Sequence, residues 1–152
     1  MRRRMSGRCG IMTGYNKVFV DTAPFIYFLE DAPTFGEKAK AVFSEVLNAE
    51  KTLVTSAVTC EEYLVHPYKM NDQESEQAFF DFVEDCNVLV APITVDIAKK
   101  AAELRAKYQA IKGMDALQLA AAIIGGCDLF LTNDRQLRQI SEIKCVMLEE
   151  WE

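Results

Sequence analysis

The feature that most constrains the fold is a repeated alternation of short apolar runs with longer amphipathic stretches. Runs rich in β-branched or aromatic residues predict five strands, at 18–20, 52–55, 88–90, 129–131 and 145–148. The intervening stretches carry apolar residues at helical spacing, and the segment 116–124, which is apolar nearly all round, predicts a buried helix. Such alternation is typical of βαβ units. The sequence therefore predicts an α/β protein with a mainly parallel sheet covered on both faces.

The domain organisation follows from length and composition. The chain has 152 residues, half of them hydrophobic, which suffices for one domain without disulfides or a structural metal. We expect a single domain over 15–152. Residues 1–14 carry four arginines without periodicity, and we interpret them as a disordered basic arm or a misplaced start. The polar segment 71–76 is expected to be a loop.

Several protein classes are excluded by composition. No apolar stretch approaches the roughly 18 to 20 residues that span a bilayer, and the basic start lacks the apolar core of a secretory signal. We therefore expect a cytoplasmic protein with no membrane contact. Five scattered cysteines without a Cys-x-x-Cys pair exclude a zinc finger and are interpreted as reduced core residues. The net charge of −6 argues against broad coating of duplex DNA.

Acidic residues stand where the predicted strands end. Asp21 follows the first strand, Glu61 and Glu62 follow the second, and Asp134 follows the fourth. Asp115 begins the apolar helical segment that precedes the fourth strand. Sites in parallel sheets form beyond the carboxyl ends of the strands, so we expect these carboxylates to gather there.

Each acid also has a purely structural interpretation. Asp21, Asp115 and Asp134 are each placed to cap a following helix, and Thr59 with Glu62 fits a capping box. As a set they are better explained by a shared cation, because a carboxylate at a buried helix is costly without a positive partner. Oxygen ligands of this kind favour Mg²⁺ or Mn²⁺.

The predicted chemistry is hydrolysis of a phosphodiester. The chain has one histidine, His66, which precedes Pro67 at an expected helix end, so a mechanism with paired imidazoles is not available. An ion held by carboxylates can activate a water molecule and stabilise both oxygens of an in-line displacement at phosphorus.

Four segments at these acids resemble the four motifs of PIN domains, in order and in spacing. They are FVDT (19–22), SAVTCEE (56–62), DALQLAAA (115–122) and LTND (131–134). The resemblance covers about residues 17–150 and is greatest to stand-alone toxin ribonucleases of the VapC type. It implies a three-layer α/β/α sandwich with a central sheet of about five strands, and cleavage of single-stranded RNA that depends on Mg²⁺ or Mn²⁺. It further implies a homodimer and an antitoxin protein as partner.

The resemblance also assigns roles to individual positions. Metal ligation falls to Asp21, Asp115 and Asp134, the acidic cluster is completed by Glu62, and Thr132 supports the cluster through a hydroxyl hydrogen bond. Glu61 is the weaker candidate of its pair, because adjacent helical residues point about 100° apart. His66 and Pro67 depart from the pattern of many members, as does the Arg-rich start.

Basic residues flank two of the acids. Lys112 and Arg135 lie nearest to the proposed metal site and are expected to contact RNA phosphates. Arg105 and Lys107 are interpreted as part of a solvated helix face.

Two other functions of small α/β proteins require acids that the sequence lacks. A phosphoacceptor receiver domain needs an acid after the third strand, where residues 90–94 have none, and an aspartyl phosphatase needs an acid at position 23, which is Ala23. A PIN-like scaffold that binds RNA or protein without cutting remains the alternative. Within the nuclease class, a housekeeping role in RNA processing stands beside the toxin role.

Overall fold

A computed structural model of the chain describes residues 14–152. Five strands form one sheet in the order β3-β2-β1-β4-β5, and every neighbouring pair is parallel. The strands are β1 (Lys17–Val20), β2 (Thr52–Ser56), β3 (Leu89–Ala91), β4 (Leu129–Thr132) and β5 (Lys144–Met147). The basic arm expected over residues 1–14 lies outside the described residues except for Gly14.

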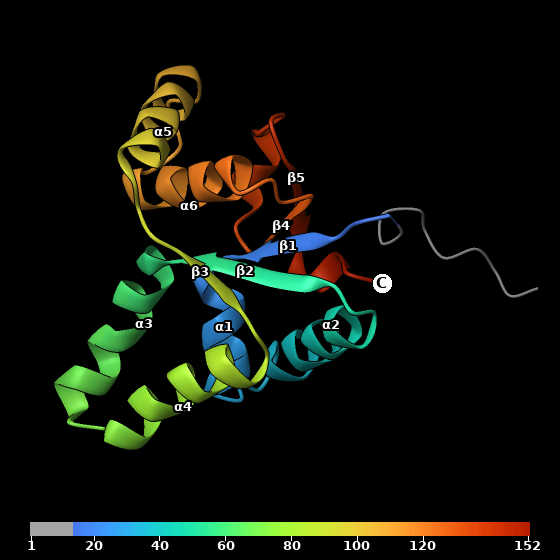
Figure 1. Cartoon of the computed structure of the whole chain (residues 1–152), viewed down its shortest axis with the longest axis vertical. Helices are drawn as coiled ribbons and strands as arrows, with labels where there is room; N and C mark the ends of the chain where they lie inside the picture. Colours follow the sequence, from blue (N-terminus) through green and yellow to red (C-terminus); the bar gives the residue numbers. More distant parts are fainter. Residues whose placement is uncertain (1–13) are drawn as a thin grey trace, which may run out of the picture.

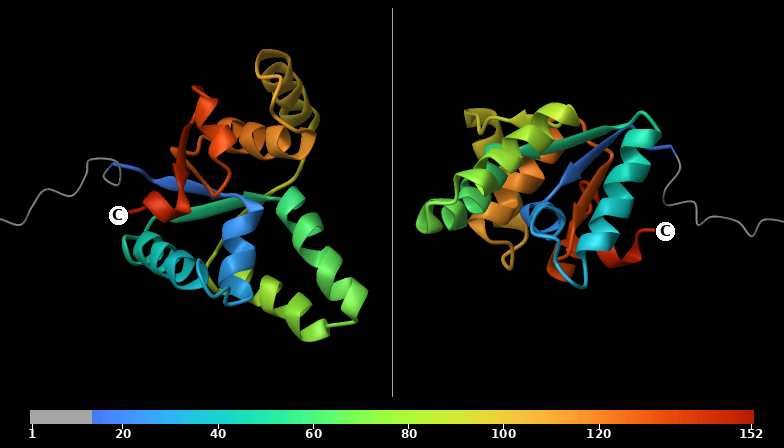
Figure 2. Two further views of the ribbon diagram at one scale, coloured as in Figure 1. Left: turned by 180° about the vertical axis from the view of Figure 1, so that it is seen from behind. Right: turned by 90° about the horizontal axis from the view of Figure 1, so that it is seen from below.

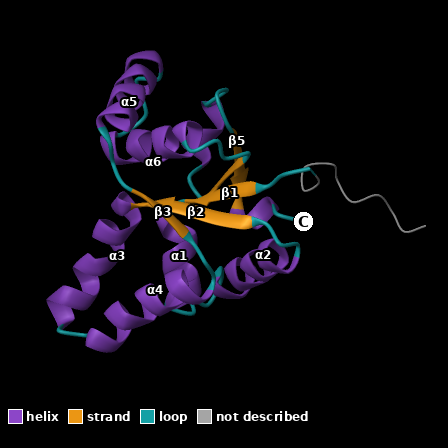
Figure 3. Ribbon diagram, viewed as in Figure 1, coloured by secondary structure: helices purple, strands orange, loops and turns teal. Residues whose placement is uncertain are grey.

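Helices cover both faces of this sheet, as Figures 1 and 3 show. One face carries α1 (Thr22–Leu29), α2 (Gly36–Asn48), α3 (Ala57–Met70) and α4 (Gln73–Asp85). The opposite face carries α5 (Val95–Lys107) and α6 (Gly113–Ile124), and two short 3₁₀ helices, η1 (Arg135–Gln139) and η2 (Leu148–Glu150), flank β5. This is the predicted α/β/α sandwich. No described helix is long and apolar enough to cross a membrane.

The two cores follow from the alternation of side chains along the central strands. On β1, Val18 and Val20 pack into the core beneath α1, α2 and α4, whereas Phe19 packs into the core beneath α5 and α6. All three side chains are fully buried. Because β1 is covered on both faces, its residues are apolar throughout, as expected for a central parallel strand.

The strand order places a topological switch point between β1 and β4. From β1 the chain builds outward through β2 to β3, then returns to the other side of β1 with β4 and continues to β5. The connections that leave β1 and β4 at their carboxyl ends therefore diverge to opposite sides. Such a point leaves a crevice at that edge of the sheet, where ligands of open α/β proteins bind.

Two local predictions were wrong, and both concern the pair formed by α3 and α4. Pro67 lies inside α3, which continues to Met70, so His66 is not at a helix end. The expected loop 71–76 is confined to Asn71 and Asp72, because Asn71 adopts a left-handed conformation that ends α3 and Asp72 caps α4 through Ser75 N. The pair projects away from the sheet (Figure 2).

Substitution of Phe130 tests the packing of the core between the sheet and helices α5 and α6. Its ring stacks on Phe19 at a centroid distance of 5.2 Å, and both rings are fully buried. Phe130→Ala should lower the free energy of unfolding by about 3 to 5 kcal/mol, because the cavity between α6 and the sheet cannot close completely. Urea denaturation followed by circular dichroism measures this. Phe80→Ala is the control, since Phe80 is 42% exposed, and a similar loss in both variants would contradict the assignment.

Candidate active site

All four predicted acids line one cavity of about 650 Å³ at the carboxyl edge of the sheet, here called the active cavity. Asp21 follows β1, Asp134 follows β4, Glu62 comes from α3 and Asp115 from the first turn of α6. Thr132 and Arg135 also line this cavity, together with Thr22, Ala23, Ile26, Tyr27 and Asn133. Four segments that are far apart in the sequence therefore converge at the switch point.

Asp21 is the most buried of these carboxylates, with 8% of its surface exposed. Its Oδ1 accepts a hydrogen bond from Thr22 N at 2.9 Å, and its Oδ2 accepts one from Thr132 Oγ1 at 2.9 Å. Burial raises the pKa of Asp21 to about 6; the two hydrogen bonds oppose this rise, and the charges of Asp115 and Glu62 add to it. The charged form of Asp21 is therefore disfavoured by its surroundings, and a nearby positive charge would stabilise it.

Asp115 and Glu62 extend the acidic cluster. Desolvation raises the pKa of Asp115, the charges of Asp134 and Glu62 raise it further, and Lys112 lowers it. Glu62 is anchored by Thr22, whose Oγ1 donates to Glu62 Oε1 at 2.7 Å. The carboxylates of the cavity therefore repel one another, and this repulsion disfavours their charged forms.

A buried polar network beneath the acids was not predicted from the sequence. Its centre is Gln118, which is 1% exposed on α6. The Gln118 amide nitrogen donates to Thr59 Oγ1 at 2.7 Å and more weakly to Asp21 and Thr22, while its oxygen accepts from Ser56. The sequence signal was one amide inside a segment that is otherwise apolar. Tyr27 and Asn133, which line the active cavity, gave no such signal.

Two of the three aspartates that were predicted to cap a helix do so. Asp21 caps α1, and Asp134 caps η1 by accepting from Gln136 N at 3.0 Å, so both residues cap a helix and also line the cavity. Asp115 is not a cap, because α6 begins at Gly113 after Lys112. The expected capping box is also wrong, since Ser56 caps α3 and Thr59 lies within its first turn.

The donor set fits a hard divalent cation, although it does not form a closed cage. Among residues 14–152, no three Asp, Glu, His or Cys side chains converge closely enough to hold an ion by themselves. Mg²⁺ commonly keeps several waters and uses one or two carboxylates together with substrate phosphates. Carboxylates from four segments around one cavity, one of them largely desolvated, match that mode of binding.

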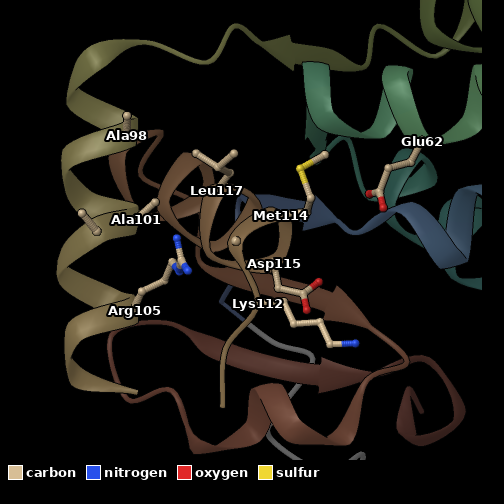
Figure 4. A pocket seen from close by; sticks show the side chains of 10 residues that line it. Glu62, Ala98, Ala101, Arg105, Lys112, Met114, Asp115 and Leu117 are labelled. Carbon is tan, nitrogen blue, oxygen red and sulfur yellow. The ribbon is translucent and has the colours of Figure 1, made fainter. Parts of the chain in front are cut away.

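The flanking residues differ in how they are placed. Arg135 lines the active cavity and pairs with Glu149 of η2. Lys112 lines a second hollow beside the cavity, as does Arg105, which is exposed as expected but also faces this hollow (Figure 4). Lys107 pairs instead with Glu142 at 2.7 Å. Glu61 is exposed and lines neither cavity, in line with its predicted orientation.

The geometry defines an α/β/α protein with an acidic cavity at the switch point of a parallel sheet. Residues 18–143 match the family model of the PIN domain. The chain therefore belongs to the PIN-domain family, which confirms the resemblance drawn from the four sequence motifs. No curated protein matches the sequence.

Solved structures with this fold include toxins of toxin–antitoxin systems. VapBC2 from Rickettsia felis, bound to promoter DNA, matches with a TM-score of 0.71 at 16% identity, covering 86% of this chain and 98% of the other. A toxin–antitoxin complex from Klebsiella pneumoniae gives 0.65 at 22%, covering 88% and 99%. VapC20 from Mycobacterium tuberculosis, a toxin that cleaves the sarcin-ricin loop, gives 0.62 at 19%, covering 84% and 98%. At these identities the likeness establishes a shared fold.

Asp21→Asn should change how stability depends on pH. The pKa of Asp21 is raised in the folded state, so the carboxyl contributes most below its ordinary value of 3.8 and this contribution is lost as the pH rises through about 6. Relative to Asp21→Asn, the free energy of unfolding of the wild type should therefore fall by about 2 kcal/mol between pH 4 and pH 7. Denaturation in the presence of a chelator measures it. A constant difference across that range would contradict the assignment.

Thr132→Val should raise the pKa of Asp21 above about 6. The substitution removes a hydroxyl that donates to the charged form of the carboxyl, so protonation becomes easier. Carbon-detected NMR titration of the Asp21 carboxyl, without metal, reports the value directly. Thr132→Ser keeps the hydroxyl and should leave the titration close to that of the wild type, so equal effects of both substitutions would count against this role.

Proposed function

We propose that this PIN domain is a metal-dependent endoribonuclease that cleaves single-stranded RNA. The observation that carries the proposal is the convergence of four carboxylates, Asp21, Glu62, Asp115 and Asp134, on one cavity at the switch point. Membership of the PIN family supports it. The product of phosphodiester cleavage carries additional negative charge, which a cavity of carboxylates could stabilise only with a bound cation.

The residues of the cavity have distinct roles in this proposal. Asp21, Asp115 and Asp134 would hold Mg²⁺ or Mn²⁺ together with waters and a substrate phosphate, and Glu62 completes the acidic cluster. A bound ion of this kind would supply an activated water and a counter-charge for the phosphodiester. Thr132 fixes the orientation of the Asp21 carboxyl through its 2.9 Å hydrogen bond. Thr22 does the same for Glu62 at 2.7 Å, so both carboxylates are positioned before a substrate arrives.

Two basic residues are proposed to contact the RNA backbone. Lys112 forms no ion pair with any of residues 14–152 and lies close enough to lower the pKa of Asp115. Arg135 borders the active cavity but shares its charge with Glu149. We therefore expect Lys112 to contribute more to phosphate binding than Arg135.

The proposed biological role is that of a cytoplasmic toxin, homodimeric and neutralised by an antitoxin protein. Its support is the recurrence of toxin–antitoxin complexes among proteins of the same fold. A small open reading frame beside the gene that encodes a DNA-binding partner would favour this role over housekeeping RNA processing. The nuclease chemistry is the same in both.

Cleavage of a labelled single-stranded RNA tests the enzymatic proposal. Purified protein should cut the RNA with Mg²⁺ or Mn²⁺, and a chelator should abolish cutting. Asp115→Asn should lower the rate by about a hundredfold or more, because loss of a metal ligand removes several kcal/mol of charge stabilisation. Isothermal titration calorimetry with Mn²⁺ should show weaker metal binding in the same variant.

Adjacent glutamates provide a matched control for this experiment. Glu62→Gln should reduce cleavage strongly, whereas Glu61→Gln should not, since both are exposed on α3 but only Glu62 lines the active cavity. Absence of metal-dependent cleavage, together with absence of metal binding, would overturn the nuclease proposal. Retained RNA or protein binding would then identify a scaffold.

A further inference from the structure

A second hollow of about 690 Å³ adjoins the active cavity and is not explained by metal binding; we call it the side hollow. It lies between α5 and α6, and Glu62 and Asp115 border both spaces. Figure 4 shows these two acids at one end and the small side chains of α5 at the other. Its lining residues are Glu62, Ala98, Ala101, Ala102, Arg105, Lys112, Gly113, Met114, Asp115 and Leu117.

The side hollow presents two cations beside the acids. Arg105 projects from α5 toward α6, and Lys112 lies beside Asp115 (Figure 4). Among residues 14–152 neither side chain forms an ion pair, unlike Lys107, which pairs with Glu142. A Cβ placed on Gly113 would lie 3.9 Å from Arg105 Nη1, so the glycine leaves space beside the guanidinium. These groups are free to bind an anion.

The rest of the side hollow is apolar and lined by small residues. Ala98 and Ala102 are exposed on α5, and Met114 on α6 is 40% exposed, with Leu117 beside it. Two adjacent alanines on one helix face leave a recess rather than a filled surface. An apolar recess with two cations, continuous with an acidic site, suits a molecule that has an anionic group and a flat apolar group.

We propose that the side hollow is a subsite for one nucleotide of the RNA next to the cleaved phosphodiester. Arg105 and Lys112 bind the phosphate of that nucleotide, and its base rests against Ala98, Ala102 and Leu117. The proposal depends on the proposed function for the identity of its ligand as RNA. It assigns Arg105 to substrate binding, beyond the four carboxylates and the flanking Lys112.

The shared border of the two spaces favours a nucleotide of the same RNA strand as the ligand of the side hollow. A phosphodiester held at the four carboxylates has neighbouring nucleotides on both sides, and the side hollow adjoins the cavity at Glu62 and Asp115, where one of them can lie. The repulsion between that strand and the acids is offset where Arg105 and Lys112 face it. A site for a free small anion would not need the apolar recess, and a purely apolar ligand would leave the two cations without a partner.

Filling the recess is the first test. Ala102→Leu places a larger side chain at an exposed helical position. Leucine has a high helix propensity, so the fold should be retained. Ala106→Leu is the matched control, because it makes the same change one turn along α5, at an exposed residue that does not line the side hollow. The probe is a fluorescein-labelled single-stranded RNA 20-mer of mixed sequence, and the readouts are KM for cleavage and Kd by anisotropy.

Anisotropy is measured in an Asp134→Asn background to prevent cleavage, since Asp134 lines the active cavity but not the side hollow. Ala102→Leu should raise KM and Kd severalfold, and Ala106→Leu should leave both unchanged. Arg105→Ala should raise Kd about tenfold, as expected for loss of a charged hydrogen bond. It should also reduce the slope of log Kd against log salt by about 0.7, while Lys99→Ala, another exposed cation on α5, should not.

The outcomes separate this proposal from the nuclease proposal. Cleavage by the wild type with KM, Kd and salt slope unchanged in Ala102→Leu and Arg105→Ala would overturn the subsite and leave the nuclease intact. RNA binding that depends on Arg105 and Ala102 without any cleavage would support the subsite and overturn the nuclease. Absence of RNA binding by the wild type would overturn both.

Discussion

The burial of the Asp21 carboxylate at the end of β1 is the interaction on which the site depends. β1 lies between β2 and β4 and is covered by helices on both faces, so a side chain directly after it is largely shielded from bulk water. The protein compensates for this with hydrogen bonds from Thr22 and Thr132, which follow β1 and end β4. The carboxylate therefore links the two strands that form the switch point, and its position is set by the sheet itself.

The remaining charges are arranged around this buried group at increasing exposure. Asp115 and Asp134 are partly buried and Glu62 is exposed, so the exposure of the acids increases from the sheet edge to the surface. Gln118 connects Asp21 to Thr59 and Ser56, which ties α6 to the start of α3 beneath the acids. These hydrogen bonds fix the segments that carry the acids relative to one another.

The sequence predicted the strands to within one or two residues and the four acids that share the cavity, because both depend on local patterns. Strand ends follow from runs of β-branched residues, and parallel strands bring their ends to one edge. It could not predict that Pro67 would lie within α3, since packing of that helix outweighs a local preference. It also could not reveal the partners of Gln118, because these hydrogen bonds join residues 59 to 97 positions apart.

The chemistry of the two adjoining spaces differs because different helix ends border them. At the active cavity, strand ends and the first turn of α6 supply carboxylates, and the small side chains of Thr22 and Thr132 hold them. At the side hollow, the turn before α6 supplies Lys112 and the last turn of α5 supplies Arg105, a favourable place for a cation near a helix C-terminus. The N-terminus of α6 thus lies between a space lined by four carboxylates and one in which Arg105 and Lys112 accompany Glu62 and Asp115.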